Sequence, residues 1–217
     1  MRLPRIKSIR SDIDLLELYK LFFEGCSEVS ETVHHPTSFY PKGGPAQLSH
    51  WISQREEGIV KVDVLLNRGA CAFAIEATAS LYSALVADLR TSSASASGVS
   101  TSAQGGYDDS AVRLSYSMAI VRFVNGIVDE QQTGLFAESI AMIAAKVGLP
   151  LWLVEIRHAA THQKCPTLQA LREGAITALR WLHDYFWEHS VALVDRSTRS
   201  QIDFPDEVTF QGLQAHP

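Results

Sequence analysis

Apolar residues recur along this chain at steps of three, four and seven, the spacing that places them on one face of an α-helix. A first stripe predicts a helix over residues 12–25, and a loop rich in proline and glycine follows at 34–45. We expect a short helix at 47–57. A long helix is expected over 62–89, because one apolar stripe runs through it: Leu65, Ala72, Ile75, Ala79, Tyr82, Val86 and Leu89.

The second half of the chain continues the helical pattern. We expect further helices over residues 110–130, from a cap at Thr133 to Val147, over 151–162 and from Leu168 to Phe186. Gly148 suits the C-terminal end of one helix, and Pro166 ends another near Cys165. No segment shows the two-residue period of a strand, so the sequence predicts an all-α helical bundle with short N-terminal helices.

Residues 91–106, TSSASASGVSTSAQGG, are almost all small and polar. Such a composition cannot bury a core. We therefore expect a disordered Ser-rich loop here, a flexible insertion within a single domain spanning residues 1–217, and not a boundary between two domains.

Composition limits the function only loosely. With 217 residues, 46% hydrophobic and 20% charged, the chain has the composition of a globular protein. A net charge of −5 argues against non-specific coating of nucleic acid, but it leaves room for a local cationic site. No apolar run reaches the roughly 18 residues that a membrane span needs, so no membrane association is expected. The basic segment MRLPRIKSIR is either a solvated arm or one that contacts phosphate.

The segment RHAATH, residues 157–162, carries the candidate chemistry. On a helix, His158 and His162 share a face about 6 Å apart, and the long side chain of Arg157 can reach the same pocket. RNA cleavage through its own 2′-hydroxyl needs a base, an acid and a cation beside the phosphorane. Two imidazoles and one guanidinium supply all three without a metal, leaving 2′,3′-cyclic phosphate and 5′-hydroxyl ends.

Three other interpretations of RHAATH stay open from the residues alone. The spacing of His158 and His162 is that of a zincin helix, but Ala159 stands where the glutamate base would be, and no third ligand is evident. A structural role for the histidines is the second alternative, since histidines near a helix end often only cap carbonyls. Cys165 is the third alternative, as a nucleophile beside the histidines, although a cysteine there is more often a packing residue.

The motif also fits the R-φ-x-x-x-H pattern of HEPN ribonucleases. Three flanking segments together resemble the Las-one family of eukaryotic pre-ribosomal-RNA endonucleases: RLSYSMAIVRFVNGIVD (113–129), GLPLWLVEIRHAATH (148–162) and PTLQALREGAITALRWLHDYFW (166–187). The resemblance implies a HEPN-type bundle in which Arg157, His158 and His162 are catalytic and in which no metal or cofactor takes part. It also implies cleavage of the second internal transcribed spacer of pre-ribosomal RNA.

Partners and location follow from the same resemblance. They are pre-ribosomal RNA as substrate, a polynucleotide kinase that phosphorylates the new 5′-hydroxyl, a homodimer formed through the HEPN domain, and the nucleus and nucleolus. Cys165 departs from the leucine expected of the family. The family's C-terminal kinase-docking region is expected to be absent, so this chain would be the catalytic domain with weak activity of its own.

Two further functions remain as alternatives to the nuclease. One is a non-catalytic HEPN scaffold that dimerises and holds RNA or the kinase, and the other is a HEPN toxin that cuts RNA broadly. Arg122 and Asn125 are expected to have a structural role, in a buried network that orients the catalytic helix, with a solvated edge or the dimer interface as the alternative location. The tryptophans at helical spacings are expected in the core: Trp152, Trp181 and Trp187.

Overall fold

The computed structural model describes residues 12–24, 44–69, 71–96, 102–132 and 138–194. Within these ranges every regular element is a helix, which confirms the predicted all-α bundle. The helices are α1 (Asp12–Phe23), α2 (Pro45–Asn67), α3 (Phe73–Ala96), α4 (Ser102–Gln131), α5 (Ile140–Lys146), α6 (Leu151–His162) and α7 (Leu168–Leu182), followed by a π-helical turn, η2 (His183–Trp187).

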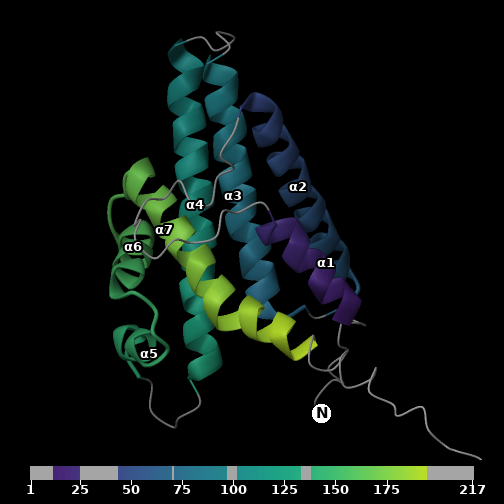
Figure 1. Ribbon diagram of the computed structural model, residues 1–217. Coiled ribbons are helices and arrows are strands. Elements are labelled where there is room, and N and C mark those ends of the chain that lie inside the picture. The colour runs from purple at the N-terminus through teal and green to yellow at the C-terminus, as the bar shows by residue number, and fades with distance from the viewer. Residues whose placement is uncertain (1–11, 25–43, 70, 97–101, 133–137, 195–217) are drawn as a thin grey trace, which may run out of the picture.

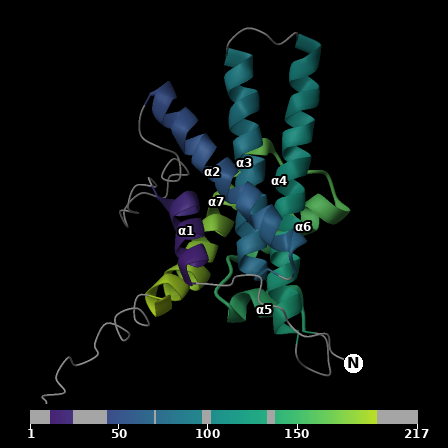
Figure 2. The same cartoon turned by 90° about the vertical axis from the view of Figure 1, so that its right-hand side faces the viewer.

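The bundle is arranged around the long pair α3 and α4, which lie side by side (Figures 1 and 2). On one side α2 packs against α3, and α1 packs against α2. On the other side α6 packs against α4, with the short helix α5 beside α6. Helix α7 crosses both members of the central pair (Figure 1). Because α4 contacts α3, α5, α6 and α7, it is the helix that fixes the position of RHAATH on α6.

Aromatic side chains fill the core where α1, α3 and η2 meet. Phe22 stacks on Tyr82 with ring centroids 5.3 Å apart, and Phe22 also contacts Trp187. Trp187 is fully buried, and its indole N–H donates to Thr78 Oγ1 at 3.0 Å. Each large ring thus packs on another ring, and the indole N–H has a partner, as burial of these groups requires.

Two buried charges connect the helices at other points. The guanidinium of Arg55 on α2 lies 4.4 Å from the ring centroid of Trp51 and donates to the backbone carbonyl of Glu24. The carboxylate of Asp88 on α3 accepts two 2.6 Å hydrogen bonds from Arg172 on α7. It also accepts one from Tyr116 on α4, so Asp88 joins three helices.

The predicted break between the helices at 47–57 and 62–89 is wrong. A single helix, α2, runs through Gly58 to Asn67, and the next helix, α3, begins at Phe73. Gly58 serves a close approach, since a Cβ there would lie 2.8 Å from the Phe22 ring. Gly69, with φ of 146°, has the backbone conformation that ends the helix.

The prediction of a disordered loop over 91–106 is also wrong where the structure describes it. Helix α3 extends to Ala96 and α4 begins at Ser102, so only residues 97–101 lie outside the described part of this stretch. Thr91 Oγ1 and Ser93 Oγ donate to carbonyls four residues earlier, at Ala87 and Leu89. Small polar residues therefore continue the helix by bonding back to it, a use that composition alone does not reveal.

Several predicted boundaries shift by a few residues. The cap of α5 is Ser139, whose side chain accepts from the Met142 N–H at 3.2 Å, whereas the predicted cap Thr133 lies outside the described residues. Most of the predicted loop at 34–45 is outside them too, and Pro45 is already the first residue of α2. Gly148, with φ of 68°, follows α5 as expected for a helix end.

Within the described residues, one helical stretch, Asp109–Gln131 of α4, is long and apolar enough to cross a membrane by length and composition alone. Half of its most apolar part is buried inside the bundle, as in the central helix of a globular fold.

Candidate active site

Helix α6 has a buried face and an exposed face, and the candidate chemistry lies mainly on the exposed one. Leu153 and Ile156 are its buried residues. A Cβ at Gly174 of α7 would lie 3.1 Å from the Ile156 side chain, so this glycine allows the two helices to pack closely. With one face anchored in this way, His158 and His162 are exposed to solvent, while Arg157 is half-buried at the boundary.

The turn after α6 is fixed by a side chain from α4. Arg113 donates from its guanidinium to the backbone carbonyls of Cys165 and Pro166, at 2.7 and 2.8 Å. The next helix, α7, then begins with Thr167 as its cap, accepting from the Ala170 N–H at 3.3 Å. The end of α6 is therefore tied to α4 as well as packed on it.

The structure brings the three predicted residues together, though not around one cavity. Arg157 and His158 line an open cavity of about 520 Å³, together with Ile140, Val154, Glu155 and Gln163. His162 is not among the lining residues. Its ring lies beside that of His158, with centroids 5.1 Å apart and planes tilted by 51°. The two imidazoles thus form a pair whose first member faces the cavity.

Arg157 is held by a residue of α4. Its Nε donates to Asn125 Oδ1 at 2.8 Å. Arg122, one turn earlier on α4, points elsewhere and forms an ion pair with Glu76 of α3. The two polar residues singled out together in the sequence therefore have different contacts, and only Asn125 touches the candidate site.

This arrangement suits the binding of an anion beside protein groups that can exchange protons with it. A guanidinium is a permanent cation whose planar fork matches phosphate oxygens, and an imidazole can donate or accept a proton near neutral pH. A phosphodiester placed against Arg157 would lie next to His158, with His162 one ring further. Among the residues that the structure describes, no three His, Cys, Asp or Glu side chains lie close enough together to bind a metal ion.

Cys165 has the surroundings of a packing residue. It is half-buried against the core, and its sulfur lies 3.4 Å from Ser117 Oγ on α4. Nucleophilic cysteines depend on a cation or base that stabilises the thiolate, whereas the sulfur of Cys165 has a hydroxyl as its hydrogen-bond partner, and Arg113 bonds its backbone carbonyl instead.

The sequence interpretation missed Glu155, Gln163 and Arg113. Glu155 precedes His158 by three residues, so helical spacing alone would have placed its carboxylate on the same face. Gln163 ends α6 as its C-cap and lines the cavity from there. No local signal identifies Arg113, because its contacts are more than 50 residues away in the sequence.

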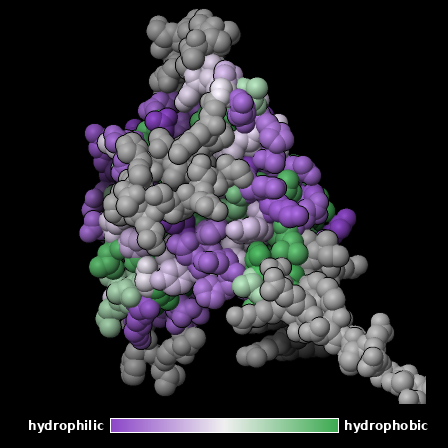
Figure 3. Space-filling view, viewed as in Figure 1, coloured by the Kyte–Doolittle hydropathy of each residue, from purple (hydrophilic) through white to green (hydrophobic). Residues whose placement is uncertain are grey.

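The α6 face also carries exposed apolar residues. Leu151 and Trp152 are 50% and 38% exposed, so the prediction that Trp152 belongs to the core is wrong, whereas Trp187 is buried and Trp181 packs against the core. Trp152 lies in the first turn of α6. Figure 3 shows hydrophobic surface at the left edge of the molecule, where α6 lies in Figure 1.

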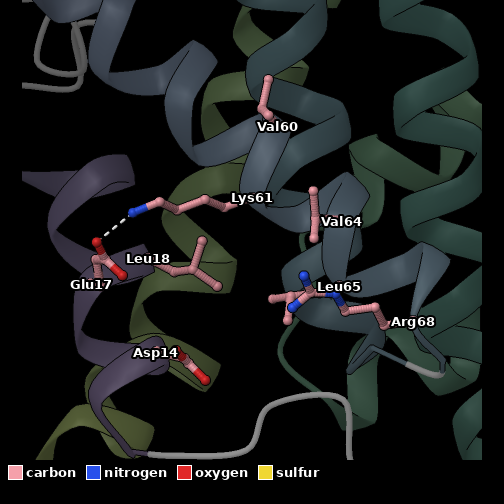
Figure 4. Close-up of a pocket in the computed structure, with 8 residues that line it drawn as sticks. All are labelled: Asp14, Glu17, Leu18, Val60, Lys61, Val64, Leu65 and Arg68. Carbon is pink, nitrogen blue, oxygen red and sulfur yellow. Dashed lines mark hydrogen bonds and ion pairs between the residues drawn. The ribbon is translucent and has the colours of Figure 1, made fainter.

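A second cavity, of about 250 Å³, lies between α1 and α2, on the other side of the central pair from α6 (Figures 1 and 4). Its walls combine apolar residues with charged ones: Asp14, Glu17, Leu18, Val60, Lys61, Val64, Leu65 and Arg68. Lys61 points across it to Glu17 (Figure 4). The cavity contains no imidazole or thiol, and we assign the chemistry to the α6 cavity.

Comparison with known proteins identifies the family of the chain. A family model described as Las1-like matches residues 8–189, a range that includes the whole of α6. The chain is 46% identical over 90 residues to Protein LAS1 of Saccharomyces cerevisiae, which covers 41% of this chain and 18% of that protein. It is 29% identical over 141 residues to the pre-rRNA-processing protein las1 of Schizosaccharomyces pombe, covering 65% of this chain and 26% of that protein.

A mammalian relative matches over a smaller share of both chains. The chain is 38% identical over 80 residues to the ribosomal biogenesis protein LAS1L of Mus musculus, covering 37% of this chain and 10% of that protein. The chain therefore aligns with about a quarter or less of the length of each of these relatives. The resemblance seen in the segments around RHAATH is confirmed by the family model, which covers most of the chain, and the chain belongs to the Las1-like family.

Proposed function

We propose that this chain is the RNA-cleaving domain of a pre-ribosomal-RNA-processing protein, and that Arg157, His158 and His162 cut RNA without a metal. The observation that carries the proposal is that Arg157 and His158 line the same cavity, and that the ring centroid of His162 lies 5.1 Å from that of His158. Relatives named for pre-rRNA processing and ribosomal biogenesis supply the substrate class. The second internal transcribed spacer is the proposed target.

The proposed reaction is transesterification at phosphorus. One imidazole removes the proton from the 2′-hydroxyl, the 2′-oxygen forms a bond to phosphorus, and the bond to the 5′-oxygen breaks. An imidazolium gives its proton to the departing 5′-oxygen. Arg157 stabilises the charge on the non-bridging oxygens. The products are a 2′,3′-cyclic phosphate and a 5′-hydroxyl, and the latter is the substrate that a polynucleotide 5′-hydroxyl kinase partner would need.

A homodimer completes this mechanism. Base and acid must act on opposite sides of one phosphorus, whereas His158 and His162 lie side by side on one helix. Two α6 helices facing each other across a two-fold axis would provide two arginines and four imidazoles around one phosphate. The exposed Leu151 and Trp152 at the start of α6 offer apolar surface for such contact. The proposed location, with this substrate, is the nucleolus within the nucleus.

The test is cleavage of spacer RNA by the chain together with its kinase, with the ends of the products mapped. We expect 2′,3′-cyclic phosphate ends, cutting that persists in EDTA when the kinase is omitted, and no cutting by Arg157→Ala. Loss of cutting in EDTA would contradict the metal-free mechanism. RNA binding without any cutting would favour a non-catalytic scaffold instead, and indiscriminate cutting of unrelated RNA would favour a toxin-like nuclease.

Mixed dimers test the shared site. Wild-type subunits are combined with subunits carrying His162→Ala, and the mixed species is isolated through two different affinity tags. If both subunits contribute to one site, the mixed dimer has far less than half of the wild-type rate. A rate of one half would mean that each subunit works alone.

A further inference from the structure

The hydrogen bond between Asn125 and Arg157 joins α4 to α6 at the edge of the candidate cavity. Arg157 Nε lies 2.8 Å from Asn125 Oδ1, the distance of a well-formed N–H···O bond. Both side chains are half-buried. Because Nε is the inner nitrogen of the guanidinium, a bond there restrains the plane of the group without occupying its two terminal nitrogens.

Those terminal nitrogens are the part of the group that can bind phosphate. Among the residues that the structure describes, Nη1 and Nη2 of Arg157 form no hydrogen bond or ion pair. A bidentate contact with two phosphate oxygens uses a pair of parallel N–H groups, so its geometry depends on the orientation of the plane. The side that faces Asn125 is used for anchoring, and the rest of the fork is left for a ligand.

The position of Asn125 is itself well determined. The next residue, Gly126, lies so close to α3 that a Cβ there would be 2.1 Å from the Phe73 ring. Phe123 and Val124 are fully buried on the same helix. The amide is therefore carried by a part of α4 that cannot shift without disturbing the core, which makes it a rigid support for Arg157.

We infer that Asn125 is a positioning residue for the reaction proposed above: it orients the guanidinium of Arg157 for the transition state and does not itself touch the RNA. The inference rests on the proposed function. A residue that acts in this way contributes to the rate of the chemical step more than to binding, since RNA affinity is spread over many phosphate contacts.

The variant that tests this is Asn125→Leu, which has nearly the same shape but no acceptor. We expect the single-turnover cleavage rate to fall about 10- to 100-fold, the cost of misplacing a catalytic group. The Kd for a 2′-O-methyl spacer RNA, which binds but cannot be cut, should change less than about threefold. Asn125→Asp keeps an acceptor at the same place and should recover most of the rate.

Two controls separate positioning from folding. Arg122→Leu alters the same helix one turn earlier and removes only the exposed pair with Glu76, so the cleavage rate should stay at the wild-type value. The ¹⁵N resonance of Arg157 Nε–H reports the bond directly. It should resist solvent exchange in the wild type and in Asn125→Asp, and it should exchange rapidly in Asn125→Leu.

The outcomes distinguish this inference from the proposed function. If Arg157→Ala abolishes cutting while Asn125→Leu cuts at the wild-type rate, Asn125 has no positioning role and the inference is wrong. If Asn125→Leu and Asn125→Asp are slowed equally, the acceptor is not what matters, and the inference again fails. If Arg157→Ala cuts as well as the wild type, the proposed function fails, and the inference fails with it.

Discussion

The exposed face of α6 and the aromatic core between α1, α3 and η2 are built on opposite principles. In the core, Trp187 is surrounded by rings, and its N–H is paired with Thr78. On α6, His158 and His162 are exposed, and their ring centroids lie 5.1 Å apart. Of the three candidate residues on α6, Arg157 is half-buried, and it alone has a hydrogen bond from its side chain to another described helix.

This contrast between the core and α6 indicates that stability and chemistry depend on different residues. Side chains of the core stabilise the fold through burial and packing, whereas the α6 imidazoles contribute little to folding and remain available to a ligand. Changes in the two regions should therefore affect different measurements.

The largest effect is expected from His162→Ala. The cleavage rate should fall about 10²- to 10⁴-fold, because a proton-transfer group is lost, while the free energy of unfolding changes by less than about 0.5 kcal/mol. RNA cleavage and urea denaturation measure the two quantities. His50→Ala, an exposed histidine on α2, is the matched control and should affect neither. A loss of stability that parallels the loss of rate would break the distinction between the two regions.

Trp187→Ala should show the reverse pattern. Removing this fully buried ring should lower the free energy of unfolding by about 3–5 kcal/mol, because it leaves a cavity and removes the hydrogen bond to Thr78. Trp152→Ala removes the same side chain from the exposed start of α6 and should cost less than about 1 kcal/mol. Equal losses for the two tryptophans would contradict the assignment of core and surface.

Local patterns predicted most of the fold, and they failed where glycine had two possible roles. The apolar stripes of α6 and α7 predicted both helices, because their apolar positions are periodic. The ends of these helices are marked by Pro150, Pro166 and Thr167. Gly58 and Gly69 look equivalent in the sequence. One allows a helix to approach Phe22, and the other ends α2 with a positive φ. Only tertiary contacts distinguish these roles.

The sequence predicted the residues of the candidate site but not the contacts that surround them. Helical spacing correctly placed His158 and His162 on one face, since that depends on neighbouring residues alone. The partner of Arg157 could not be deduced in the same way, because Asn125 is 32 residues away and the contact depends on how α4 and α6 pack. The sequence paired Asn125 with Arg122, whereas the fold directs these two side chains to different helices.

Gly126→Ala tests the support that connects the two regions. The added methyl would overlap the Phe73 ring and should lower the free energy of unfolding by about 1–3 kcal/mol. Because Asn125 is adjacent, the cleavage rate should fall too. A double variant that combines Gly126→Ala with Phe73→Ala has no such overlap. The loss of stability caused by Gly126→Ala should therefore be smaller in the Phe73→Ala protein than in the wild type. A Gly126→Ala protein that is as stable as the wild type would show that Phe73 moves aside freely.

The smallest effect is expected on the far side of the bundle, where Lys61 of α2 pairs with Glu17 of α1 beside the second cavity (Figure 4). The hydrogen bond from Lys61 to Glu17 raises the pKa of the ammonium above its ordinary value of 10.5. A raised pKa in the folded state means that the contribution to stability is complete below pH 10.5 and is lost as the pH rises through the folded-state pKa.

Lys61→Met should therefore lower the free energy of unfolding by less than about 0.5 kcal/mol at pH 7, since the two side chains are 34% and 54% exposed and water screens the pair. The difference between variant and wild type should shrink as the pH rises beyond 10.5 through the folded-state pKa, and it should also shrink in 1 M salt. Urea denaturation across this pH range measures it, with Glu17→Gln as the partner variant in a double-mutant cycle. A difference that persists unchanged at high pH would mean that the charge of Lys61 contributes nothing to stability and that its apolar stem packs against Leu18. This edge of the molecule would then be an extension of the core.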